Sequence, residues 1–136
     1  MERLNFGENT EYNAVEASIH LNRYALARPF CKGKKVLDIA CGEGYGSYLM
    51  KMWGAKQIDA IDIDQETIEK ASAMFFDESI NYLCHTAEDL PYTNNSFDLI
   101  VSLETIEHLD YPDKFLLELK RVLKPDGTLI LSCPND

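Results

Sequence analysis

Short apolar runs that alternate with amphipathic stretches predict strands followed by helices along the whole chain. Several runs are nearly continuous, which is typical of parallel strands covered on both faces. The predicted strands cover residues 36–40, 58–61, 80–84, 97–103 and 128–133. Because helical patterns separate most of these runs, the sequence predicts an α/β fold with a parallel sheet and helices on both faces.

Four stretches carry apolar residues near helical spacing. They cover residues of about 11–28, then 45–53, 65 to 75 or 76, and 112–123. The first helix is expected to end before Pro29, Asp64 is a predicted N-cap of the third, and Pro112 suits the first turn of the fourth. The predicted buried stripes of the last three helices are Tyr48, Leu49 and Met52, then Ile68, Ala71 and Phe75, then Phe115, Leu116, Leu119, Val122 and Leu123.

A glycine loop follows the first predicted strand and opens the next helix. Gly42, Gly44 and Gly46 permit backbone torsions and a close ligand approach that side chains would prevent. The first N–H groups of the helix lack internal partners and favour an anion. A dinucleotide fingerprint starting at Gly42 would require glycine at position 47, which is Ser47.

The end of the second predicted strand carries a carboxylate. Asp62 lies 20 residues beyond Gly42, where the strand should end beside the glycine loop. A carboxylate in this position can accept two hydrogen bonds from a ribose diol. The spacing is shared with NAD-binding folds, so it predicts a nucleoside ligand without choosing between nucleosides.

Composition and charge exclude several classes of function. The 136 residues include 23 acids and 13 bases, which gives a net charge of −10 without a basic cluster and argues against nucleic-acid binding. No apolar run approaches a membrane span of about 20 residues, and the N-terminus lacks the apolar stretch of a signal peptide, so a cytoplasmic location is expected. The four cysteines lie far apart, without a C-x-x-C pair, and predict reduced packed thiols rather than a metal site.

Four stretches together resemble the class I S-adenosylmethionine-dependent methyltransferases of the type 11 group. They are D-x-x-x-G-x-G at 38–44, the acid at 62, T-A-E-D-L-P-Y at 86–92, and S-F-D-L-I-V-S at 96–102 through L-K-P-D-G-T-L at 123–129. The resemblance implies a Rossmann-like sheet of order 3-2-1-4-5. The family sheet carries sixth and seventh strands, whereas this chain stops at residue 136. We therefore expect a single domain, residues 1–136, that is C-terminally short and could form a homodimer through its exposed fifth strand.

The resemblance also implies which residues would bind S-adenosylmethionine and its product S-adenosylhomocysteine. Asp38 would help to hold the ammonium group, Arg23 would reach the methionine carboxylate, and Ile63 would pack on the adenine. The adenine edge would be contacted around Ala87 and by Glu88, because Thr86 replaces the usual aspartate. The full expected set is Arg23, Asp38, Ala40, Gly42, Gly44, Tyr45, Asp62, Ile63, Ala87, Glu88 and Leu103.

The implied reaction is in-line transfer of a methyl group to a small-molecule acceptor. Glu104 and His108 follow the fourth strand and are the catalytic candidates. His108 could act as a general base, because the pKa of an unperturbed histidine lies near neutrality, although a structural role in the loop is favoured. Two alternatives stay open: a cofactor-binding module or enzyme fragment without its own acceptor site, and a NAD-dependent oxidoreductase, which Ser47 disfavours.

Overall fold

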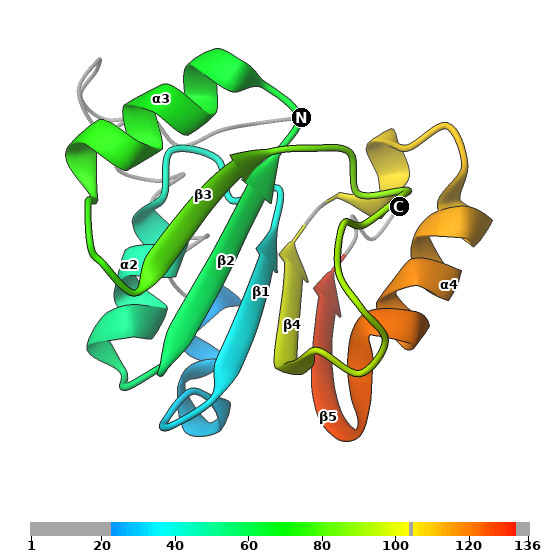
Figure 1. Cartoon of the computed structure of the whole chain (residues 1–136), viewed down its shortest axis with the longest axis horizontal. Coiled ribbons are helices and arrows are strands. Elements are labelled where there is room, and N and C mark those ends of the chain that lie inside the picture. The colour runs from blue at the N-terminus through cyan, green and yellow to red at the C-terminus, as the bar shows by residue number, and fades with distance from the viewer. Residues whose placement is uncertain (1–22, 104, 133–136) are drawn as a thin grey trace.

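The computed structural model describes residues 23–103 and 105–132, which form a five-stranded parallel sheet. The strands are β1 (Lys35–Ile39), β2 (Gln57–Asp62), β3 (Ile80–Cys84), β4 (Phe97–Leu103) and β5 (Leu123–Ser132). Their order across the sheet is β3-β2-β1-β4-β5, so the predicted order is confirmed (Figure 1). Since every ladder is parallel, the carboxyl ends of all five strands meet at one edge of the sheet.

Helices cover both faces of this sheet, as predicted. They are α2 (Tyr45–Met52), α3 (Gln65–Met74) and α4 (Pro112–Val122), together with two short 3-10 helices, η1 (Arg28–Phe30) and η2 (Ile106–His108). Met50 of α2 and Ile68 of α3 pack in one core cluster, and Phe115 and Leu119 of α4 pack in a second cluster on the other face. The helices α2 and α3, which connect β1 to β2 and β2 to β3, therefore lie on one side of the sheet, and α4 lies on the other (Figure 1).

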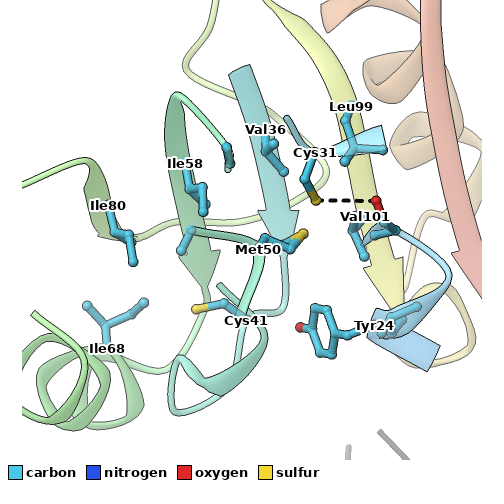
Figure 2. Close-up of a cluster of buried hydrophobic side chains, with 14 residues drawn as sticks. Tyr24, Cys31, Val36, Cys41, Met50, Ile58, Ile68, Ile80, Leu99 and Val101 are labelled. Atoms are coloured by element: carbon cyan, nitrogen blue, oxygen red, sulfur yellow. Dashed lines mark hydrogen bonds between the residues drawn. The ribbon is translucent and has the colours of Figure 1, made fainter. Parts of the chain in front are cut away.

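The first cluster holds the glycine loop and α2 against the sheet. Figure 2 shows Met50 lying between the strands and Tyr24, with Ile68 pointing towards Ile80 at the far side of the cluster. Cys31 is buried here, and its thiol donates a hydrogen bond to the carbonyl of Ala27 at 3.2 Å. Side chains from both the helices and the strands thus hold α2 against the sheet.

The buried face of α2 differs from the predicted one. The structure buries Gly46, Ser47 and Met50, whereas the apolar pattern predicted Tyr48, Leu49 and Met52. Met52 is 66% exposed. The reason is that a glycine and a serine face the core, Gly46 against the ring of Tyr24 and Ser47 towards a buried carboxylate, so the apolar periodicity pointed to the wrong face.

Three element ends also differ from the predictions. Residues 23–25 are helical, but a turn at 26–27 precedes η1, and Pro29 lies inside η1 rather than after a helix that ends at Arg28. Proline is tolerated there because the first turn of a helix needs no N–H from it. Phe75 caps α3 instead of extending its buried stripe. Residues 11–22 of the predicted first helix lie outside the described residues.

The end of α4 and the start of β5 form the third difference. Leu123 begins β5 instead of ending the helix, and Leu116 is 41% exposed although it was predicted to be buried. β5 therefore starts five residues before the predicted strand, with a register irregularity opposite residues 97–99 of β4. Phe115, Leu119 and Val122 are buried as predicted. Cys133, the last predicted strand residue, lies outside the described residues.

The predicted N-cap of α3 is confirmed. The side chain of Asp64 accepts a hydrogen bond from the backbone N–H of Glu66 at 3.2 Å, so it is the N-cap of α3. Cys31, Cys41 and Cys84 are free thiols. Within residues 23–103 and 105–132, no helix combines the length and the apolar character that crossing a membrane requires.

Candidate functional site

A pocket of about 300 Å³ opens at the carboxyl edge of the sheet. The ends of β1 and β2, the residues after β3, and η2 with its flanking residues form its walls. The lining residues are Ile39, Ala40, Ile61, Asp62, Ile63, His85, Thr86, Ala87, Glu88, Thr105, His108, Leu109 and Asp110. Open parallel α/β sheets bind their ligands at this edge, where the loops from successive strands converge.

Asp62 is a buried polar group of the pocket that hydrogen bonds hold in place. Its side chain is buried, and its two carboxylate oxygens accept hydrogen bonds from the backbone N–H groups of Gly42 at 3.1 Å and Asp64 at 3.0 Å. These bonds tie the glycine loop after β1 to the turn after β2. Each carboxylate oxygen can accept more than one hydrogen bond, so the same group can also receive hydroxyls from a ligand.

An apolar side chain stands next to this carboxylate. Ile63 lines the pocket and is 70% exposed. It directly follows β2, whose residues from Ile58 to Asp62 are all buried. Ala87 also lines the pocket and is buried. A polar group beside exposed apolar surface suits a ligand with a sugar diol and a flat base.

The start of the glycine loop has an unusual backbone. Ala40 lines the pocket with φ at 57°, a left-handed conformation that costs an L-residue roughly 1–2 kcal/mol. Gly42 and Gly44 also have positive φ values of 58° and 94°. A Cβ on Gly44 would lie 3.0 Å from both Ala71 and the hydroxyl of Tyr82, so space as well as torsion requires glycine there.

Asp38 lies below the loop, out of reach of solvent. The Ser47 hydroxyl donates to it at 2.6 Å and the Tyr24 hydroxyl at 3.1 Å. The pKa of Asp38 is raised to about 7. Burial is the main cause and the nearby charge of Asp62 adds to it, whereas the hydrogen bonds from the two hydroxyls act in the opposite direction. Burial and the charge of Asp38 likewise raise the pKa of Tyr24 well above its ordinary value.

The third glycine of the loop makes room for Tyr24. A Cβ on Gly46 would lie 1.9 Å from the ring, so either the buried ring or the helix would have to move. Tyr24 and Ser47 therefore hold Asp38 from two sides, and the ring of Tyr24 covers the first turn of α2. These contacts hold the glycine loop through Asp38, whereas Asp62 holds it at the pocket through the N–H of Gly42.

The residues after β3 supply the next wall. The backbone N–H of His85 donates to the carbonyl of Asp62 at 3.1 Å, and the Thr86 hydroxyl accepts from the N–H of Glu88 at 3.2 Å. Thr86 therefore stabilises the turn that presents Ala87 and Glu88. This is a contact that the aspartate of the resembling sequences could also make, because both side chains offer an oxygen at the same place.

η2 forms the remaining wall. His108 lines the pocket with a half-exposed side chain, and its Nε2 lies 3.4 Å from a carboxylate oxygen of Glu107. The backbone N–H of His108 donates to the carbonyl of Thr105, which is buried. Glu104, the other catalytic candidate, lies outside the described residues.

The structure brings together part of the predicted binding set. Ala40, Asp62, Ile63, Ala87 and Glu88 line the pocket, and so does the catalytic candidate His108. Asp38, Gly42, Gly44, Tyr45, Leu103 and Arg23 do not line it.

The residues outside the pocket have identifiable places. Asp38 and Leu103 are buried, and Leu103 packs in the first core cluster with Tyr24. The ring of Tyr45 is tilted against that of Phe75, with the ring centres 6.1 Å apart. Arg23 lies in the helical turn before Tyr24. None of these residues forms part of the pocket wall.

Sequence reasoning missed several lining residues. His85 directly follows β3, and Thr105 lies two residues after the end of β4, so their places near strand ends were a usable signal. Leu109 and Asp110 follow η2, a short helix that no periodicity predicted. The site as a whole can bind and orient a nucleoside-like ligand beside a histidine and several carboxylates.

Comparison with known proteins identifies relatives of this arrangement. The model of the family described as "Methyltransferase domain" matches residues 37–131. A ubiquinone biosynthesis O-methyltransferase from Parvibaculum lavamentivorans is 35% identical over 127 residues, which cover 91% of this chain and 49% of that protein. A Mycobacterium tuberculosis protein named "Probable S-adenosylmethionine-dependent methyltransferase" is 32% identical over 112 residues, 82% of this chain and 40% of that protein.

A solved structure shares the fold. The cyclase SpnF superposes with a TM-score of 0.74 at 27% sequence identity, covering 83% of this chain and 43% of that one. The chain spans less than half the length of the curated relatives named above.

Proposed function

The chain belongs to the methyltransferase domain family, which confirms the resemblance found in its sequence, and on that premise we propose that its pocket binds S-adenosylmethionine for methyl transfer to a small molecule. The observation that carries the proposal is Asp62, a buried carboxylate at the end of β2 that two backbone N–H groups hold in place at the pocket. It would accept hydrogen bonds from the two ribose hydroxyls. S-adenosylhomocysteine would be the product.

The remaining pocket residues fit an adenosine group. Ile63 would pack against the base with its exposed apolar side chain, and the backbone around Ala87 would meet the base edge. Glu88 lies on the same turn and would accept from the base amino group. Gly42 and Gly44 have positive φ values, and the loop they form would let the main chain approach the remaining part of the ligand closely.

When bound, S-adenosylmethionine supplies a methyl group activated on a sulfonium. The chain's own contribution would be alignment, because holding the acceptor in line with the methyl group in a water-poor cleft lowers the barrier without covalent catalysis. His108 is at the pocket wall and would accept a proton from an acceptor that must lose one. Glu104 stays a sequence-based candidate for the rim of the pocket.

A small-molecule acceptor is supported by one of the relatives named above. That relative is named for ubiquinone biosynthesis, and its O-methyl transfer is a property of that protein. The net charge of −10 disfavours nucleic acid as the acceptor. A cytoplasmic location stays a prediction from the sequence.

A second candidate function is a binding module without methyl transfer of its own. It is favoured by the similarity to a cyclase, whose name describes a reaction other than methyl transfer. Incubation of the chain with S-adenosylmethionine carrying a labelled methyl group and a panel of phenols, amines and carbon acids separates the two. Labelled product supports the enzyme, whereas binding without any transfer supports the module.

Calorimetric titration tests the binding proposal. We expect saturable binding of S-adenosylmethionine and S-adenosylhomocysteine, and none of NAD⁺. Asp62→Asn should weaken both by about tenfold or more, because a ribose hydroxyl loses a charged acceptor. Asp64→Asn is the matched control: it lies two residues away, does not line the pocket, and keeps an N-cap side chain. Binding of NAD⁺ alone, or equal affinity in both variants, would refute the proposal.

A further inference from the structure

The connection between β3 and β4 (residues 85–96, the β3–β4 connection) carries four of the pocket residues without any helix or strand of its own. It runs from the end of β3 beside α4 to the start of β4 (Figure 1). No ladder can hold such a segment in place. Its position must therefore come from individual contacts with its surroundings.

Two side chains on one turn of α4 supply most of these contacts. Glu118 accepts a hydrogen bond from the backbone N–H of Leu90 at 2.7 Å. Arg121 donates to the carbonyl of Leu90 at 3.0 Å and to the carbonyl of Tyr92 at 2.6 Å. It also donates to the side-chain oxygen of Asn94 at 3.2 Å. Glu118 and Arg121 thus contact three residues of the β3–β4 connection, which are Leu90, Tyr92 and Asn94.

The pair is itself rigid. Nε and Nη2 of Arg121 donate to the two carboxylate oxygens of Glu118 at 2.6 and 2.9 Å, a two-point contact within one helical turn. The side chains are 32% and 17% exposed. The hydrogen bond from Arg121 lowers the pKa of Glu118, so the carboxylate stays charged at neutral pH. Planar two-point pairs of this kind have a defined geometry that a lysine cannot reproduce.

The other end of the β3–β4 connection is attached to the ribose side of the pocket. The N–H of His85 donates to the carbonyl of Asp62, and Leu90 is buried among the apolar side chains under α4. Ala87 and Glu88 therefore lie between two attachment points, one at the end of β2 and one at the Glu118–Arg121 pair. Their positions depend on both.

We propose that the Glu118–Arg121 pair is a positioning element that sets the selectivity of this pocket for its purine base. The proposal rests on the proposed function, in which the turn at Ala87 and Glu88 meets the base edge. Discrimination between an amino and a carbonyl group on the base requires acceptors that cannot move to suit either one. A looser connection would retain part of the affinity, which Asp62 and Ile63 also supply, but would lose discrimination.

The test compares two ligands that differ at one position of the base. S-adenosylhomocysteine carries an amino group there, and S-inosylhomocysteine carries a carbonyl. Calorimetric affinities for both are measured with the wild-type chain and with Arg121→Gln, Arg121→Lys and Glu118→Gln. Lys120→Gln is the control, because it removes a neighbouring exposed charge from the same helix. Circular dichroism and thermal unfolding establish that each variant is folded at the titration temperature.

We expect the wild-type chain and Lys120→Gln to share one preference for the amino ligand. Arg121→Gln and Glu118→Gln should reduce this preference by about fivefold or more, since each removes part of the two-point pair. Arg121→Lys should also lose the wild-type preference, because a lysine cannot reproduce the two-point contact. If Arg121→Gln does not fold, Glu118→Gln and Arg121→Lys decide the question, because both keep a polar side chain of similar length.

The possible failures are distinguishable. Variants that melt at lower temperature but keep the wild-type preference would show a structural role alone and would overturn the positioning role. A wild-type chain that binds both ligands equally would overturn it as well, while leaving the proposed function intact. A folded wild-type chain that binds neither ligand would refute the proposed function and this inference together.

Discussion

At the scale of single residues, Ala40 holds a backbone conformation that suits glycine better. Its φ of 57° costs an alanine roughly 1–2 kcal/mol, and the larger freedom of glycine in the unfolded chain offsets about half of that. Ala40→Gly should therefore raise the free energy of unfolding by up to about 1 kcal/mol. Urea denaturation followed by circular dichroism measures it.

The matched control for this change is Ala60→Gly. Ala60 is fully buried in β2 and is absent from the residues with positive φ. Glycine in a strand interior costs about 0.5–1 kcal/mol in chain entropy, in addition to the lost packing. Opposite signs for the two variants are expected, and equal destabilisation by both would contradict the role of the torsion at Ala40.

Asp38 makes the stability of the protein depend on pH. Its pKa is raised to about 7 in the fold, while in the unfolded chain it should be near 3.8, the ordinary value for an aspartic acid. The protonated form is thus favoured by folding, and its contribution is complete below pH 4 and is lost as the pH rises through 7. The free energy of unfolding should fall over this interval, by roughly 2–4 kcal/mol from this group.

Asp38→Asn removes the titration and keeps a similar shape. Denaturation series at pH 4, 5.5 and 7 should show a smaller fall for the variant than for the wild-type chain, because the amide stays neutral throughout. Ser47 and Tyr24 can still bond to the amide oxygen. Parallel curves for the two proteins would mean that Asp38 is ionised in the folded state.

Residue identity predicted part of the site in advance. Asp62 was recognisable because it lies 20 residues beyond Gly42, where a carboxylate at the end of the second strand is expected. The burial of Asp38 was not, since an acid in the motif gives no sign of whether it faces a ligand or two hydroxyls. Its partner Tyr24 is 14 residues away and comes into contact through the fold.

At the scale of elements, α2 depends on the space that Gly46 leaves for Tyr24. Gly46→Ala would place a methyl group 1.9 Å from the ring, so the helix or the ring must shift. Overpacking of a core costs about 1–3 kcal/mol, and we expect the upper part of that range. Chemical denaturation of Gly46→Ala measures the loss.

A double-mutant cycle identifies the origin of that loss. In a Tyr24→Leu background the ring is absent, and Gly46→Ala should cost at least about 1 kcal/mol less than in the wild-type chain. Additive effects would contradict a clash between these two residues and would point to another constraint on the helix.

The elements themselves were predictable to different degrees. β3 and β4 occupy the predicted residues, because alternation and a long apolar run have few other interpretations. The exposed face of α2 and the early start of β5 were not predictable. The first depends on a glycine and a serine packing inward, and the second follows from pairing of Leu123 with Phe97 of β4.

At the scale of the whole molecule, β5 forms one edge of the described sheet. It pairs with β4 on one side, and Leu129 and Leu131 are 39% and 37% exposed. An exposed strand with apolar side chains favours pairing with another chain. The homodimer through the fifth strand that the sequence predicts therefore stays a prediction.

Sedimentation equilibrium tests the dimer. We expect the wild-type chain to associate in a concentration-dependent way, and the variant Leu129→Lys/Leu131→Lys to remain monomeric because charged side chains on an edge strand oppose pairing. A monomer at every concentration up to about 100 µM would contradict the predicted association, since a dimer with a micromolar Kd would be populated there.

The fold as a whole followed from the sequence, because the strand order, the helices on both faces and the carboxyl-edge site all accompany the four motif stretches. The acceptor did not follow, since the roles proposed for the pocket residues concern an adenosine group and the chain spans less than half the length of the curated relatives named above.

The most direct test of the central claim is a crystal structure of the chain with S-adenosylhomocysteine. The two ribose hydroxyls should lie within hydrogen-bond distance of the Asp62 carboxylate, with the base between Ile63 and Ala87. A ligand bound elsewhere, or one bound in this pocket with its ribose away from Asp62, would contradict the account.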